Sequence, residues 1–152
     1  LHYPLRRQRQ MCIRDRINLP EVTLEVIDRV GLDNVRITVD FGGMELGIRP
    51  HMEIEEAFRM FAPYLNHVHA KDITGVIGNW NMCWYGGGMV NFARYAKALE
   101  AIGYDGYVCV EWEGWFKGGP GGVGDMDSAG LADMDRASLE AYEFLAPHFE
   151  KK

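Results

Sequence analysis

The sequence has no uninterrupted apolar run of the roughly 20 residues that a membrane-spanning helix needs. It also has only three cysteines, Cys12, Cys83 and Cys109, and their spacing shows no pairs. We therefore interpret them as reduced thiols and expect a cytoplasmic protein that has no membrane partner. What is present is ordinary for one globular domain, with 47% hydrophobic residues and 18 glycines in 152 residues.

Basic residues are concentrated in one short segment. The formal charge of the chain is −6, but residues 6–16 carry five Arg and one Asp, so the rest of the chain has a formal charge of −10. This segment resembles the in-frame translation of a transposon-type sequencing-library adapter. We therefore expect residues 1–16 to be non-native and disordered, and to form no part of the fold. The alternative is a basic arm that binds nucleic acid or an acidic surface.

Hydrophobic periodicity predicts a helix followed by three strand–helix units. Pro20 favours a helix start, and Gly31 and Gly103 are typical helix stops. Strands that alternate with helices favour a parallel sheet. The expected helices cover residues 19–30, 53–65, 92–102 and 135–149, the expected strands 35–40, 66–72 and 106–111, and the expected loops 41–47, 73–90 and 115–130.

Each expected strand has one aliphatic face and one face that carries polar groups. Because side chains alternate along a strand, His67, His69 and Lys71 share one face of the middle strand. Asp40 and Glu111 occupy matching places at the ends of the other two strands. Asp40, His69 and Glu111 are therefore our candidate metal ligands. Two carboxylates and one imidazole suit Mn²⁺ or Mg²⁺, and Zn²⁺ or Co²⁺ remain alternatives.

The asymmetry of these strands distinguishes between two parallel architectures. Central strands of a doubly wound sheet are apolar on both faces, whereas barrel strands present one face to the helices and the other to the lumen. A complete (β/α)₈ barrel needs about 250 residues, and this chain has three clear units. We therefore expect residues 17–152 to be the C-terminal part of a (β/α)₈ TIM barrel that is truncated on its N-terminal side.

These motifs together resemble the sugar phosphate isomerase/epimerase family, the xylose-isomerase-like TIM barrels. The segments that carry the resemblance are Val39-Asp40, His67-Val68-His69-Ala70-Lys71-Asp72, Gly86 to Phe92 and Gly103 to Glu111. The family includes ketose 3-epimerases, hydroxypyruvate isomerase and inosose dehydratase, with endonuclease IV more distant.

The resemblance implies that Asp40, His69 and Glu111 are metal ligands and that Glu111 is also the catalytic carboxylate. It further implies a Glu on an earlier strand that is both a metal ligand and the second proton-transfer group. No residue here matches it, and we expect it upstream of this chain. Where the family often has a His three residues after the Asp, this sequence has Gly43. That departure and the acidity of the chain disfavour a nuclease and a nucleic-acid partner.

Four further residues are predicted to contact a substrate, and three of them have a structural alternative. Lys71 would hold a hydroxyl, carboxylate or phosphate oxygen, or else pair with Asp72 or Asp40. Trp84 and Tyr85 would cover the apolar face of a sugar, although Trp84 is equally suited to plug the core. His67 is either a substrate contact or a hydrogen-bonded structural histidine.

Two glycine-rich stretches are also ambiguous. Gly86-Gly87-Gly88 forms either an anion-binding nest of backbone N–H groups or a simple turn. Residues 119–124 fit Gly-x-Gly-x-x-Gly, but they do not lie between a strand and a helix that opens immediately, so we interpret them as a loop.

The resemblance implies an isomerase or epimerase that moves a proton on a sugar, a polyol or a keto acid through a metal-stabilised enediolate. A dehydratase at the same metal site and an inactive sugar-binding fragment are the alternatives. We expect a small-molecule substrate and no activity from this chain alone. A homo-oligomer of the full-length protein is left open.

Overall fold

The computed structural model describes residues 19–111 and 128–150, with side chains described from residue 135 onward in the last helix. The adapter-like segment and residues 119–124 lie outside these ranges. Among the residues that the structure describes, no helix combines the length and the apolar character of a membrane span.

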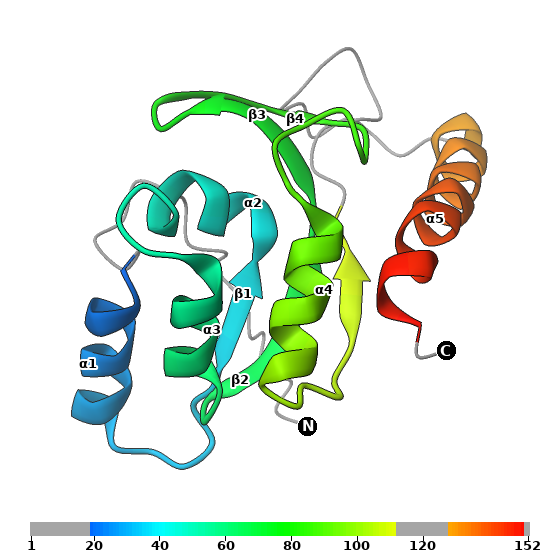
Figure 1. Cartoon of the computed structure of the whole chain (residues 1–152). Coiled ribbons are helices and arrows are strands. Elements are labelled where there is room, and N and C mark those ends of the chain that lie inside the picture. Colours follow the sequence, from blue (N-terminus) through cyan, green and yellow to red (C-terminus); the bar gives the residue numbers. More distant parts are fainter. Residues whose placement is uncertain (1–18, 112–127, 151–152) are drawn as a thin grey trace.

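A three-stranded parallel sheet forms the centre of the fold (Figure 1). Strands β1 (Ile37–Asp40), β2 (Leu65–Ala70) and β5 (Val108–Val110) lie in the order β1-β2-β5. The register pairs Asp40 with His69 and Ala70 with Val110. The C-terminal ends of the strands therefore meet at one edge, as predicted for part of a barrel. The described strands close no barrel.

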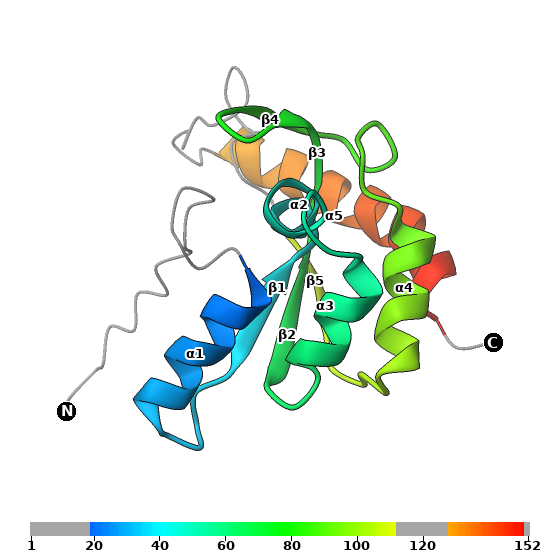
Figure 2. The same ribbon diagram turned by 60° about the vertical axis from the view of Figure 1, so that its left-hand side comes forward.

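Four longer helices accompany the sheet. They are α1 (Pro20–Val30), α3 (Ile54–Phe61), α4 (Phe92–Ala101) and α5 (Ser128–Phe149), and each contacts the next along this series (Figure 2). Pro20 begins α1 and Gly31 ends it with a left-handed φ of 61°. Asn91 caps α4 by accepting a hydrogen bond from the backbone N–H of Arg94. These sequence signals were interpreted correctly.

The core lies between the aliphatic face of the sheet and these helices. Three side chains of this core have no exposed surface, namely Val68 of β2, Phe58 of α3 and Tyr95 of α4. The Tyr95 ring stands edge-on to Phe58, with ring centroids 5.9 Å apart, and lies 4.3 Å from the centroid of Phe41. These contacts anchor α3 and α4 to the residues that directly follow β1.

Residues 41–47, predicted as a loop, are helical instead. A short turn α2 (Phe41–Gly43) leads into a π-helical turn η1 (Met44–Ile48). Asp40 begins this segment as its N-cap, because its side chain accepts a hydrogen bond from the Gly43 N–H. Apolar side chains then bury the turn in the core.

Residues 73–90 were also predicted as a loop, but they contain an antiparallel hairpin of β3 (Asp72–Val76) and β4 (Asn79–Cys83). Gly78 lies in its two-residue turn at φ 85°, a conformation that glycine adopts readily. At Gly75, a Cβ would lie only 2.3 Å from the Asn79 carbonyl oxygen. The hairpin extends beyond the C-terminal ends of the parallel strands (Figure 1).

Two helix predictions need correction. The last helix begins at Ser128, within the predicted loop 115–130, and not at residue 135. The helix predicted over 53–65 ends at Phe61, because a turn closed by the Tyr64 N–H and the Phe61 carbonyl leads into β2. In α5, Leu139 and Tyr142 are 57% and 59% exposed, although we expected them on its apolar face. The face that packs inward instead carries small residues and one leucine, namely Ala137, Ala141 and Leu145.

Candidate metal site

Three candidate ligands converge where the parallel strands end. Asp40 is the last residue of β1 and lies opposite His69 of β2, and Glu111 follows β5. The backbone N–H of Glu111 donates to the Ala70 carbonyl over 3.1 Å, which fixes Glu111 beside β2. One ligand atom from each of the three residues lies within 4.8 Å of the others. We call Asp40, His69 and Glu111 the ligand cluster.

His69 and Glu111 form one closely spaced pair in the ligand cluster. His69 Nδ1 lies 3.2 Å from Glu111 Oε2. Two adjacent ligands of one ion, each about 2.1 Å from it, lie about 3 Å apart in octahedral geometry. This pair is therefore already spaced as two ligands of one ion.

Asp40 has one carboxylate oxygen engaged and one available. Its Oδ1 accepts the hydrogen bond from Gly43, whereas its buried Oδ2 makes no hydrogen bond within the described residues. Burial raises the pKa of Asp40 to about 8; the nearby Lys71 ammonium lowers it, and the nearby Glu111 carboxyl raises it. A carboxylate that is costly to ionise in this way is stabilised by a bound cation, so its environment fits a metal ligand.

Lys71 lies inside the same cluster. The residue is only 5% exposed, and its Nζ lies 3.4 Å from both Asp40 Oδ2 and Glu111 Oε2. Of the two pairings that we considered for Lys71, the structure has the one with Asp40. Asp72 is engaged elsewhere.

Asp72 fills the glycine turn formed by residues 86–88. Its Oδ2 accepts hydrogen bonds from the N–H groups of Gly86 and Gly88, both at 2.9 Å. Its Oδ1 accepts from Ile73 at 2.9 Å and from Val90 at 3.1 Å. The nest that we considered for an external anion therefore exists, but the chain's own carboxylate occupies it.

Gly88 is needed for this arrangement because a Cβ there would lie 2.1 Å from Asp72 Oδ1. Sequence reasoning did not identify Asp72 as a partner of the glycine turn. The available signal was an aspartate at a strand end followed by three consecutive glycines.

The remaining predicted site residues lie at different depths. Tyr85 is 5% exposed, and its hydroxyl donates to the Ala70 carbonyl over 2.7 Å. Trp84 is partly buried and stands edge-on to Tyr85. The ring of His67 contacts that of His69 edge-on with centroids 5.0 Å apart, and burial together with His69 lowers the pKa of His67. Their proposed contacts with a substrate stay predictions.

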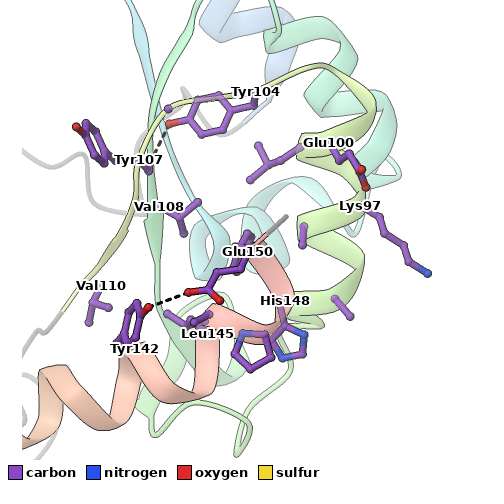
Figure 3. A pocket seen from close by; sticks show the side chains of 17 residues that line it. Lys97, Glu100, Tyr104, Tyr107, Val108, Val110, Tyr142, Leu145, His148 and Glu150 are labelled. Atoms are coloured by element: carbon purple, nitrogen blue, oxygen red, sulfur yellow. Dashed lines mark hydrogen bonds between the residues drawn. The ribbon is translucent and has the colours of Figure 1, made fainter. Parts of the chain in front are cut away.

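A cavity of about 950 Å³ lies away from the ligand cluster, between α4, β5 and α5 (Figure 3). Val108 and Val110 line it, and they point to the side of β5 opposite Cys109. Tyr142 stands at its edge with its hydroxyl 2.8 Å from Glu150 Oε1. The cavity is therefore on the helix side of the sheet and plays no part in the candidate metal site.

The parallel sheet with helices and the acidic and imidazole groups at its C-terminal edge define an α/β protein of the TIM-barrel type. The sequence model of the xylose isomerase-like TIM barrel matches residues 9–146, and the chain belongs to that family. No curated protein matches the sequence.

Solved structures of similar fold include sugar epimerases. D-psicose 3-epimerase from Clostridium cellulolyticum H10, solved with D-tagatose, has a TM-score of 0.61 and 23% identity over 88% of this chain and 45% of its own. L-ribulose 3-epimerase has a TM-score of 0.59 and 19% identity over 87% and 42%. For 3-keto-D-glucoside 4-epimerase from E. coli the TM-score is 0.50, with 21% identity over 82% and 41%. The chain thus spans less than half the length of each of these proteins, and at these identities the likeness concerns the fold.

Proposed function

We propose that this chain supplies the metal-binding edge of a divalent-metal-dependent sugar isomerase or epimerase. The observation that carries the proposal is the convergence of Asp40, His69 and Glu111, whose ligand atoms lie within 4.8 Å of one another. Family membership and the resemblance in fold to three sugar epimerases support a sugar as the substrate class.

The residues present fit a divalent cation. Asp40 Oδ2 is buried without a hydrogen bond in the described part of the chain, and the His69–Glu111 spacing already suits two ligands of one ion. The donor set of two carboxylates and one imidazole favours Mn²⁺ or Mg²⁺. Such an ion would supply Lewis-acid polarisation of a carbonyl and orient the substrate.

The protein groups would bind the substrate and move its protons. In our proposal the Glu111 carboxylate takes a proton from the carbon next to the substrate carbonyl, which requires it to be ionised. The Lys71 ammonium would donate hydrogen bonds to a substrate oxygen. Trp84 would present an aromatic face to the apolar side of a sugar ring.

A reducing compartment is compatible with this proposal. Cys83 and Cys109 are free thiols, and burial raises the pKa of Cys83 to about 11. We therefore assign a structural role to Cys83, and we propose a cytoplasmic location.

Calorimetric titration with Mn²⁺ tests the proposed site. We expect one Mn²⁺ site per chain. Asp40→Ala, His69→Ala and Glu111→Ala should each weaken Mn²⁺ binding by about 100-fold or more. Mutating a residue that only hydrogen-bonds to a ligand typically weakens metal binding by about 10–100-fold, so removing a ligand itself should cost at least as much. Glu21→Ala removes an exposed carboxylate from α1 and is the matched control. Unchanged binding in all three ligand variants would refute the site.

A further inference from the structure

The ammonium of Lys71 and the proposed metal ion would share the same oxygens. Asp40 Oδ1 is engaged by Gly43, so Oδ2 is the oxygen that Asp40 can offer to an ion. Lys71 Nζ lies 3.4 Å from this Oδ2 and 3.4 Å from Glu111 Oε2, and the same Glu111 Oε2 lies 3.2 Å from His69 Nδ1. The internal cation therefore stands at the carboxylate oxygens that define the ligand cluster.

The position of Lys71 is built into the fold. A Cβ on Gly42 would lie 3.2 Å from Lys71 Cγ and 2.9 Å from Ile73 Cγ2. The aliphatic part of the Lys71 side chain therefore packs against α2 at Gly42, which has no side chain of its own. The next residue, Asp72, is held by four backbone N–H groups. These constraints direct a buried ammonium, 5% exposed as a residue, toward the two carboxylates.

We propose that Lys71 is a built-in competitor of the divalent ion, which holds Asp40 and Glu111 together in the metal-free chain and weakens metal binding. This inference rests on the proposed function and deepens it. Without a metal, the ammonium lies within 3.4 Å of both carboxyl groups and favours the ionised form of Asp40. When a divalent ion binds, two cationic centres meet the same oxygens within a few ångströms, and their repulsion opposes binding.

In this proposal the displaced ammonium then binds the substrate. Once the ion compensates the carboxylates, Lys71 is released from them and its N–H groups turn to an oxygen of the substrate. Binding of the ion and recruitment of Lys71 to the substrate are thereby coupled, because the ammonium cannot serve both partners at once.

The test is Mn²⁺ binding, without any sugar, measured by the loss of the free-ion EPR signal and by calorimetry. The variants are Lys71→Met, which removes the charge and keeps the length, Lys71→Gln, which keeps a polar group, and Lys71→Arg, which keeps the charge. Lys97→Met removes an exposed charge from α4 and controls for net charge. Circular dichroism establishes that each variant is folded.

We expect Lys71→Met and Lys71→Gln to bind Mn²⁺ roughly tenfold to a hundredfold more tightly than the unmodified chain, since an adjacent like charge is lost. Lys71→Arg binds no more tightly than the unmodified chain, and Lys97→Met is unchanged. We also expect the metal-free Lys71→Met variant to melt at a lower temperature and to gain a larger increase in Tm from Mn²⁺.

The outcomes separate the two claims. Equal or weaker binding by the folded Lys71→Met or Lys71→Gln variant, while the unmodified chain binds Mn²⁺ and Asp40→Ala does not, overturns the competitor role and leaves the proposed metal site standing. If neither the unmodified chain nor any Lys71 variant binds Mn²⁺, the metal site fails, and the competitor role fails with it.

Discussion

Two aspartates near the strand ends have opposite surroundings. The Asp72 carboxylate is 1% exposed as a residue and accepts four backbone hydrogen bonds, so its charge is fully compensated. Asp40 has one buried oxygen without a hydrogen bond in the described residues, and burial raises its pKa to about 8. The same residue type thus accepts four backbone hydrogen bonds at one position, whereas at the other one of its oxygens lies 3.4 Å from a lysine ammonium without a hydrogen bond in the described residues.

This difference separates a structural role from a functional one. Buried polar groups are almost always hydrogen-bonded, so an exception calls for an explanation. Asp72 ties the end of β2 to the glycine turn and the start of α4. Asp40 is held by Gly43 through one oxygen only, and its other oxygen faces Lys71 and Glu111.

The largest effect should come from the compensated aspartate. Asp72→Asn replaces an acceptor that serves four N–H groups by an amide that carries donors, and we expect it to lower the free energy of unfolding by about 3–5 kcal/mol. Urea denaturation measures this change, and Asp33→Asn, at an exposed position, is the control. A loss below about 1 kcal/mol would show that Asp72 does not have the structural role that we assign to it.

Gly88→Ala should be similarly severe, with a loss of about 3 kcal/mol or more, because the added Cβ would lie 2.1 Å from Asp72 Oδ1 and 2.4 Å from the Ile73 carbonyl oxygen. Gly103→Ala is a useful contrast. Nothing lies within 4 Å of its added Cβ, so only the strain of φ 70° contributes. Gly88 is not among the glycines with positive φ, so a loss no larger than that of Gly103→Ala would show that contact with Asp72 does not make Gly88 necessary.

At Asp40 we expect the corresponding substitution not to lower the free energy of unfolding of the metal-free chain. Asp40→Asn should abolish most Mn²⁺ affinity, yet leave the metal-free chain at least as stable at pH 8 as the unmodified chain, because it removes a carboxylate that is costly to ionise. Denaturation at pH 8 in the presence of EDTA tests this. Strong destabilisation would mean that Asp40, like Asp72, is a structural carboxylate.

Stability should depend on pH through Asp40. Its pKa is about 8 in the folded chain against an ordinary value of 3.8, so the folded state keeps a proton that the unfolded chain has already released. The free energy of unfolding of the metal-free chain should therefore fall as pH rises toward 8. Measurements between pH 6.5 and 8 limit the contribution of His67, whose lowered pKa removes stability only as pH falls.

The Asp40→Asn variant is the control for this profile. In this variant the free energy of unfolding should change little between pH 6.5 and 8. Saturating Mn²⁺ should offset the fall in the unmodified chain, since the ion binds the ionised carboxylate. A slope that persists in Asp40→Asn would assign the titration to another group.

The smallest effect is expected at Gly43. Its φ of −62° suits any residue, and an added Cβ would lie 3.1 Å from Asp40 Oδ1. Gly43→Ala should change the free energy of unfolding by no more than about 1 kcal/mol and leave Mn²⁺ affinity within about threefold, because the N–H that holds Asp40 is retained. A large loss of Mn²⁺ affinity would show that the short contact displaces Asp40.

The fold and the ligand cluster were predictable to the extent that they depend on local patterns. Alternation along strands placed Asp40, His69 and Glu111 in phase, and the parallel register then brings them together. Asn91 and Gly31 marked helix boundaries because caps are local signals.

The partners of Asp72 were not predictable in this way. Asp72 accepts hydrogen bonds from residues 14 to 18 positions further along the chain, which only the path of the β3–β4 hairpin brings back. The exposed positions of Leu139 and Tyr142 were missed because packing against α4 and β5, rather than hydrophobicity alone, selects the inner face of α5.

The most direct test of the central claim is a crystal structure of the chain grown with Mn²⁺, with the ion located by its anomalous scattering. We predict one ion about 2.0–2.3 Å from a ligand atom of each of Asp40, His69 and Glu111, with Lys71 Nζ moved away from Asp40 Oδ2. An ordered ligand cluster that holds no ion at saturating Mn²⁺, or an ion bound at other residues, would contradict the account.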